Sequence, residues 1–185
     1  MRRRPSDRRC DRRRHALCWW TYDQLTGIEE EAHVDLPEYY YSLLQADLKT
    51  YISQAELIAG IMPFWSRPDL FAGRRVIHFM DNTAALSALA NGYSRKPDLA
   101  RLVNLYHVAV VALGCEWWGE WVPSAANLAD IPTREKSAGR RPAHVRDGGA
   151  VELPPLHWGA GQLRGWMARM EERHLEAVQR GRGAA

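Results

Sequence analysis

Cysteine is scarce in this sequence. The chain has three cysteines in 185 residues, Cys10, Cys18 and Cys115, and no two of them form a CxxC pair. They cannot all pair within one chain, so free thiols and a reducing compartment are expected. The seven histidines have no ligand-like spacing with the cysteines, so no zinc motif is present.

Long apolar runs are also missing. The longest run near the N-terminus covers residues 16–20, which is much shorter than the core of a signal peptide or a membrane span. The sequence therefore predicts an intracellular protein, cytoplasmic or nuclear, with no membrane partner. It predicts nothing about the oligomeric state.

Acidic residues are sparse in the first segment of the chain. Residues 1–14 hold eight of the 25 basic side chains and only two of the 22 acidic ones, which leaves 17 basic and 20 acidic residues elsewhere. A solvated, basic arm over residues 1–15 is expected, and electrostatic attraction to nucleic acid is concentrated in it. Such blocks are typical of nuclear-localisation or phosphate-binding arms, and equally of tails without a specific role.

The remaining chain alternates strand and helix patterns, which indicates an α/β fold. Strands are expected over residues 16–22, 29–35 (a polar edge strand), 74–81 (buried on both faces) and 115–122, and helices over residues 47–65, 83–91 and 97–113. The expected domain spans residues 16–134. Residues 135–157 are rich in Gly, Pro and charge and are expected to be a linker, and residues 158–185 form a C-terminal helix and tail.

Three acids stand at positions where a carboxylate is costly. Glu56 lies on the apolar stripe of its predicted helix, Asp81 ends the apolar strand, and Asp130 follows the last strand between Pro123 and Pro132. Each alone has an ordinary explanation as a helix cap, a turn residue or a side chain that reaches water. Together, acids from a helix, a strand end and a loop are typical of an oxygen-ligand site for a hard cation. Such sites suit phosphoryl chemistry.

The motifs around these acids carry a family resemblance. QAEL at Glu56, FMDNTAAL at Asp81 and WVPSAANLADIPTR at Asp130 resemble the ribonuclease H domain that follows the reverse transcriptase in retroelement (retrotransposon) polyproteins. The resemblance implies a ribonuclease H-like mixed sheet flanked by helices, here with an extra C-terminal helix. It also implies a Mg²⁺- or Mn²⁺-dependent nuclease that hydrolyses the RNA strand of RNA–DNA hybrids and is associated with a reverse transcriptase. Glu56, Asp81 and Asp130 would then be catalytic metal ligands.

The family's first ligand, an Asp in its first strand, has no evident counterpart here. In the preferred alignment, residues 16–27 are the family's second strand and the domain is N-terminally truncated. In the competing alignment, residues 18–23 are the first strand and Asp23 is the ligand. Two other functional classes stay open. One is an inactive nucleic-acid-binding or scaffold remnant of a retroelement, and the other is a nuclease or transposase that shares the carboxylate fold, with roles in DNA integration or transposition.

Tryptophans are the remaining unusual feature. They cluster on two predicted strands as Trp19, Trp20, Trp117, Trp118 and Trp121. Burial in the core is the favoured interpretation, and base stacking is the alternative. Arg95 and Lys96, after the predicted helix 83–91, are surface residues with the chemistry to contact a phosphate.

Overall fold

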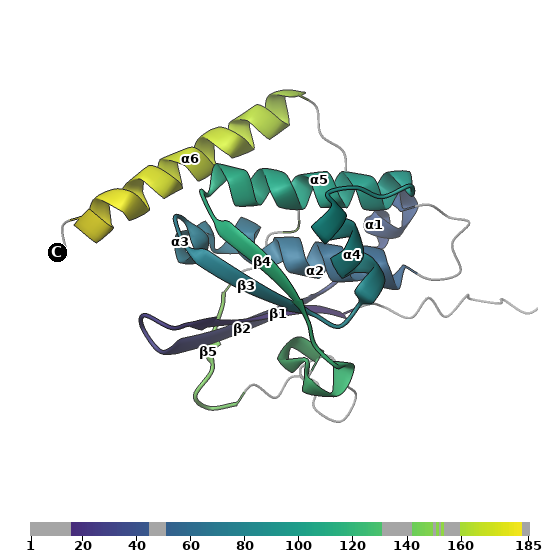
Figure 1. The fold of residues 1–185 in the computed structure, drawn as a ribbon, viewed down its shortest axis with the longest axis horizontal. Helices are drawn as coiled ribbons and strands as arrows, with labels where there is room; N and C mark the ends of the chain where they lie inside the picture. Colours follow the sequence, from purple (N-terminus) through teal and green to yellow (C-terminus); the bar gives the residue numbers. More distant parts are fainter. Residues whose placement is uncertain are drawn as a thin grey trace, which may run out of the picture.

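The computed structural model describes residues 16–44, 51–130, 142–149, 151, 153 and 160–182. The predicted basic arm, residues 1–15, lies outside the described residues, as does most of the predicted linker. Within the described part, strands and helices mix as the sequence predicts, and the α/β class is confirmed (Figure 1).

The strands form two separate sheets (Figure 1). In the first, β1 (Ala16–Asp23) and β2 (Ile28–Asp35) make an antiparallel hairpin, and β5 (Arg146–Asp147) pairs parallel with β2. In the second, β3 (Arg75–Met80) and β4 (Glu116–Trp121) pair in parallel. Among the described residues, β1 and β3 each keep one edge without a strand partner. One mixed sheet was expected, and two are found.

The hairpin turn depends on Asp23. Its carboxylate accepts hydrogen bonds from the Leu25 backbone N–H at 3.0 Å and the Thr26 hydroxyl at 2.9 Å, and its carbonyl accepts from the Gly27 N–H at 2.8 Å. Gly27 has a φ of 67°, which glycine adopts without a side-chain clash. Asp23 is thus a turn residue at the closed end of the hairpin.

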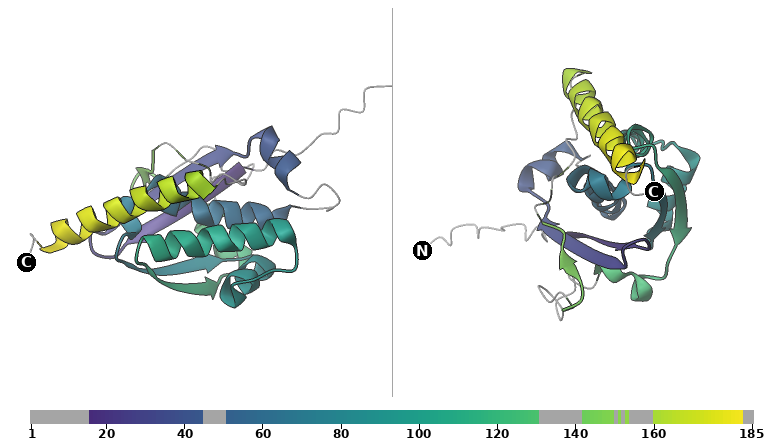
Figure 2. Two further views of the ribbon diagram at one scale, coloured as in Figure 1. Left: turned by 90° about the horizontal axis from the view of Figure 1, so that it is seen from above. Right: turned by 90° about the vertical axis from the view of Figure 1, so that its left-hand side faces the viewer.

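The helices are α1 (Glu38–Leu43), α2 (Ile52–Ser66), α3 (Pro68–Phe71), α4 (Thr83–Asn91), α5 (Pro97–Ala112) and α6 (Ala160–Arg182). Two short 3₁₀ turns, η1 (Ser124–Ala126) and η2 (Leu128–Asp130), follow β4. In the end-on view of Figure 2, α2 lies inside the angle between the two sheets. Its Leu57, Ile58, Ile61 and Met62 are fully buried and form the centre of the core.

Helix α6 runs beside α5 and extends past the body (Figure 1). Its Trp166 ring stacks on Trp65 of α2, with centroids 4.1 Å apart and an angle of 7° between the planes. Met170, one turn further along α6, is also buried. The extra C-terminal helix therefore shares its core with the rest of the fold.

Two details of the strands correct the sequence interpretation. β3 was expected to be buried on both faces, but Ile77 and Phe79 are 59% and 56% exposed. The helices cover the face that bears His78 and Met80, and no described element covers the other face. β2 was expected to be a polar edge strand. It lies instead between β1 and β5, and its Glu30 and Glu31 are buried. Glu30 pairs with Arg67 at the end of α2.

The segment expected to be a linker also contributes to the sheet. Residues 146–147 form β5, and the Gly148 N–H donates to the carbonyl of Glu31 at 2.8 Å. A Cβ at Gly148 would lie 2.4 Å from the Trp19 ring, so only glycine fits beneath that ring. Composition alone did not reveal this contact, because it depends on a strand far away in sequence.

Gly60 of α2 lies against His78 of β3. A Cβ there would lie 2.7 Å from Cε1 of His78, a buried ring whose Nδ1 lies 2.6 Å from the Tyr106 hydroxyl. We expect Gly60→Ala to lower the free energy of unfolding by about 1–3 kcal/mol, because neither ring can move away freely. Urea denaturation measures the change. Gly165→Ala on exposed α6 is the matched control, and should stabilise by about 0.5–1 kcal/mol. Equal effects at both sites would contradict the close-packing argument.

Candidate functional site

The three acids singled out in the sequence come from three different elements. Glu56 lies in the first half of α2, Asp81 directly follows β3, and Asp130 ends η2. The pKa of Glu56 is raised to about 7, first by burial and then by the negative charges of Asp81 and Asp130. The charges of Asp81 and Asp130 thus act on Glu56, although the three residues are far apart in sequence.

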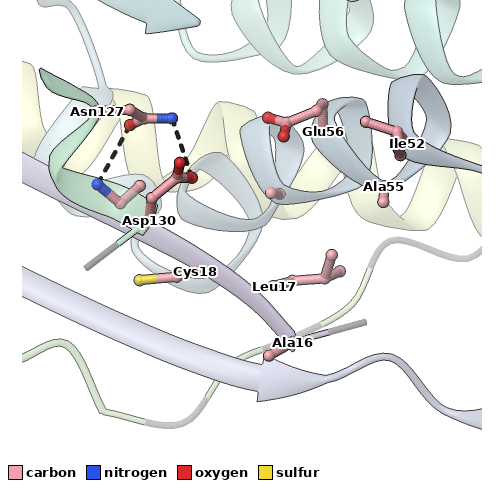
Figure 3. Close-up of a pocket in the computed structure, with 10 residues that line it drawn as sticks. Ala16, Leu17, Cys18, Ile52, Ala55, Glu56, Asn127 and Asp130 are labelled. Carbon is pink, nitrogen blue, oxygen red and sulfur yellow. Dashed lines mark hydrogen bonds between the residues drawn. The ribbon is translucent and has the colours of Figure 1, made fainter. Parts of the chain in front are cut away.

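A pocket of about 140 Å³ lies between β1, α2 and the 3₁₀ turns. Figure 3 shows the carboxylates of Glu56 and Asp130 pointing into the same space, with Asn127 above Asp130 and the first residues of β1 below. Ala16, Leu17 and Cys18 line the β1 side, and Ala55 and Ala59 line the α2 side. We call this space the acidic pocket.

Asp81 does not cap helix α4. The cap is Asn82, whose Oδ1 accepts the Ala85 N–H at 3.0 Å and lies 3.4 Å from the Ser53 hydroxyl. Oδ1 of Asp81 is buried and has no hydrogen-bond partner within the described residues. A buried carboxylate oxygen without a donor is costly, so this atom favours a cation or another donor beside it.

The position of Asp130 depends on Asn127, a residue that the sequence analysis did not single out. The Asn127 Nδ2 donates to Oδ1 of Asp130 at 3.3 Å, and its Oδ1 accepts the Ala129 N–H at 3.2 Å. The Asn127 side chain therefore links the backbone of η2 to the carboxylate of Asp130, the last residue of that turn. The only sequence signal was the spacing of Asn and Asp in NLAD, which is common in ordinary turns.

Asp23 does not join these acids. It lies at the turn end of β1, whereas the pocket is lined by the opposite end, Ala16–Cys18. Its Oδ1 lies 3.5 Å from Nη1 of Arg74, which precedes β3, whereas Asp81 follows β3. The alignment that made Asp23 the first-strand ligand is therefore wrong for this site.

The acids do not form a closed ligand shell. Within the ranges that the structure describes, no group of three or more His, Cys, Asp and Glu side chains is arranged to hold a metal ion. The donor set is nevertheless suited to a hard cation, because it consists of carboxylate oxygens and includes the unpartnered Oδ1 of Asp81. Glu56, Asp81 and Asp130 are the residues that would hold such an ion.

The tryptophans divide between the core and the surface. Trp19 is buried, and Trp117 packs edge-on against Tyr106 and His107. Trp118 and Trp121 are 65% and 50% exposed. The Trp121 indole N–H donates to the main-chain carbonyl of Asp81 at 3.3 Å, so this ring lies beside the acids. Burial in the core is therefore correct for Trp19 and Trp117 and wrong for Trp118 and Trp121.

A second hollow lies on the other side of α4. Its lining includes the cationic Arg95 and Lys96, and the full set is Ser53, Ala84, Ser87, Ala88, Asn91, Tyr93, Ser94, Arg95, Lys96 and Leu99. Ser53 lies in the first turn of α2, which also carries Glu56. The hollow offers the Ser53 hydroxyl of α2, the Asn91 amide of α4, and the cationic groups of Arg95 and Lys96 before α5.

Comparisons with protein-family models, with curated proteins and with solved structures find no match to this chain. Within the described ranges, none of the helices combines the length and the apolar character needed to cross a membrane.

The raised pKa of Glu56 makes stability depend on pH. Folding raises this pKa from 4.5 to about 7, so the folded state binds the proton more tightly. The stabilisation is complete below pH about 4.5 and is lost as the pH rises through about 7. We expect Glu56→Gln to be more stable than the parent at pH 8, by up to about 3 kcal/mol before solvent screening. The two should unfold alike at pH 4.

Urea denaturation at the two pH values measures this difference. Glu171→Gln is the control, because Glu171 is exposed on α6. An equal change at pH 4 and pH 8 in the Glu56 variant would contradict the assigned environment.

Proposed function

We propose that this chain is a ribonuclease H-like, metal-dependent endonuclease domain that hydrolyses the RNA strand of RNA–DNA hybrids. The observation that carries the proposal is that Glu56 of α2 and Asp130 of η2 line one pocket, with the charge of Asp81, at the end of β3, acting on Glu56. The buried, unpartnered Oδ1 of Asp81 adds to it, because ordinary structural acids have their oxygens satisfied.

The arrangement of elements supports the finer fold assignment. A parallel pair, β3 and β4, lies next to Asp81, and α2 packs on β1 and meets β3 where Gly60 lies against His78. One further strand between the open edges of β1 and β3 would join the two sheets into a single mixed sheet. Its end would lie at the acidic pocket, where the family resemblance places the first-strand acid.

The chain's own residues have separable roles in this proposal. Glu56, Asp81 and Asp130 would hold Mg²⁺ or Mn²⁺, which supplies Lewis acidity and an activated water for phosphodiester hydrolysis. Asn127 orients the Asp130 carboxylate, and the Trp121 indole N–H restrains the backbone at Asp81. Because ionised Glu56 is needed as a ligand, its pKa of about 7 favours activity above neutral pH.

Asp81→Asn tests the enzyme directly. We expect it to lower Mn²⁺-supported cleavage of an RNA–DNA hybrid by about a hundredfold or more, because the amide loses the ligand's charge and keeps its shape. Cleavage of a labelled hybrid, resolved on a gel, measures the rate.

The matched control is Asp23→Asn, which changes an acid at the far end of β1. It should cleave within about twofold of the parent. If the parent neither cleaves the hybrid nor gains thermal stability with Mg²⁺ or Mn²⁺, the proposal is wrong.

A second candidate function is nucleic-acid binding without cleavage. The exposed rings of Trp118 and Trp121 favour it, because sheet-borne aromatic rings stack on bases. The Arg95 and Lys96 hollow adds cationic groups for the phosphates. In this case the carboxylates are remnants and the aromatic face carries the function.

Trp118→Ala tests the binding role. We expect it to weaken binding of single-stranded RNA by about 1–3 kcal/mol through loss of stacking. Fluorescence anisotropy of a labelled oligonucleotide measures the affinity. Leu175→Ala, at an exposed apolar residue on α6, should leave the affinity unchanged. Equal affinities for all three proteins would rule out stacking on Trp118.

A further inference from the structure

The exposed face of the β3–β4 pair is apolar at its centre. Exposed side chains alternate with more buried ones along both strands, and the exposed set is Arg75, Ile77 and Phe79 on β3 and Glu116, Trp118 and Glu120 on β4. We call this surface the outer face. A sheet face that meets water is ordinarily polar, and contiguous exposed apolar side chains mark interaction sites.

The sequence of β3 has the pattern of a strand that is covered on both sides. Val76 and Met80 point to one face and Ile77 and Phe79 to the other, so apolar residues occupy both sets of alternating positions. Such runs are typical of strands buried on both faces. Because Ile77 and Phe79 are exposed in the described structure, the pattern is satisfied only when a further surface packs on the outer face.

The charged residues of the outer face indicate the chemistry of that surface. Arg75 lies opposite Glu116 in the strand register, and its Nε donates to Oε2 of Glu116 at 2.8 Å. Glu120 accepts the Trp118 indole N–H at 3.1 Å. One basic and two acidic side chains thus surround the apolar centre. Their balance disfavours a polyanion, whereas a surface that carries both signs of charge is complementary to it.

We propose that the outer face is a dimer interface with a second copy of this chain. The two-fold axis lies in the plane of the interface and runs along the strands between β3 and β4, so that β3 of each copy lies over β4 of the other. Arg75 then faces the partner's Glu116, and Ile77 faces the partner's Trp118. The dimer goes beyond the proposed nuclease and does not depend on it.

The charges select this axis over the other one that the face allows. With a two-fold axis perpendicular to the strands, Glu116 would lie over the partner's Glu120, and two carboxylates would meet. With the axis along the strands, two arginines and two glutamates alternate around it at one end of an apolar centre. Aligned sheets pack about 10 Å apart in this way.

The size of the face determines the strength of the dimer. Two strands of six residues cover roughly 10 Å by 20 Å, which is less than the about 800 Å² per partner that stable complexes bury. We therefore expect weak, concentration-dependent association.

Sedimentation equilibrium of the full chain, at about 10 μM to 1 mM protein, measures this association. Arg75→Glu and Glu116→Arg should each weaken it at least about tenfold, because like charges then meet at both symmetric contacts. Arg164→Glu, on an exposed position of α6, is the matched control. It changes the net charge as Arg75→Glu does and should associate like the parent. Equal association of all four proteins would overturn the proposal.

An equimolar mixture of Arg75→Glu and Glu116→Arg separates contacts between copies from contacts within one chain. In the mixed dimer every charge at positions 75 and 116 meets its opposite across the interface, while like charges remain side by side within each chain. The mixture should associate within about threefold of the parent, although neither variant does so alone. A mixture no stronger than its components would overturn the proposal.

Trp118→Ala tests the apolar centre and should also weaken the association at least about tenfold. If the parent stays monomeric at about 1 mM while this variant loses affinity for single-stranded RNA, the face binds nucleic acid and the proposal is overturned. If the dimer forms as described and hybrid cleavage is absent, the dimer stands and the proposed nuclease fails.

Discussion

The burial of α2 between two sheets is the constraint on which the rest of the structure depends. The helix contributes the fully buried Leu57, Ile58, Ile61 and Met62 to the core, and Gly60 lets it approach the His78 ring of β3. That approach leaves no freedom to rotate the helix. Glu56 must therefore face the space where β3 and η2 end, and it enters the electrostatic field of Asp81 and Asp130. The apolar packing of the rest of α2 offsets the repulsion between Glu56 and the other two carboxylates.

The division into two sheets is the second organising feature. An edge of β1 and an edge of β3 are open among the described residues, while α2 packs on β1 and meets β3 where Gly60 lies against His78. Open edges are ordinarily a liability in a folded protein. Here the first residues of β1 line the acidic pocket, and β3 ends at Asp81, whose charge acts on Glu56.

The exposed aromatic and apolar residues of β3 and β4 form the second surface feature of the molecule. Ile77, Phe79 and Trp118 share the outer face of β3 and β4, whereas Trp121, which pairs with Met80, ends β4 beside the Asp81 carbonyl. An aromatic surface therefore lies close to the carboxylates. Its rings could stack on bases, and the carboxylates could bind a cation.

The sequence by itself determined the local elements, because their signals are local. Pro97 and Gly92 mark helix boundaries, and the apolar periodicity of α5 is regular, so these helices were predicted almost to the residue. The sequence also selected Glu56, Asp81 and Asp130, because an acid within an apolar pattern is visible without a structure. Only the tertiary structure decided which acids meet. It excluded Asp23, made Asn82 rather than Asp81 the cap of α4, and separated one expected sheet into two. Those outcomes depend on contacts between residues far apart in the chain, and no local pattern encodes them.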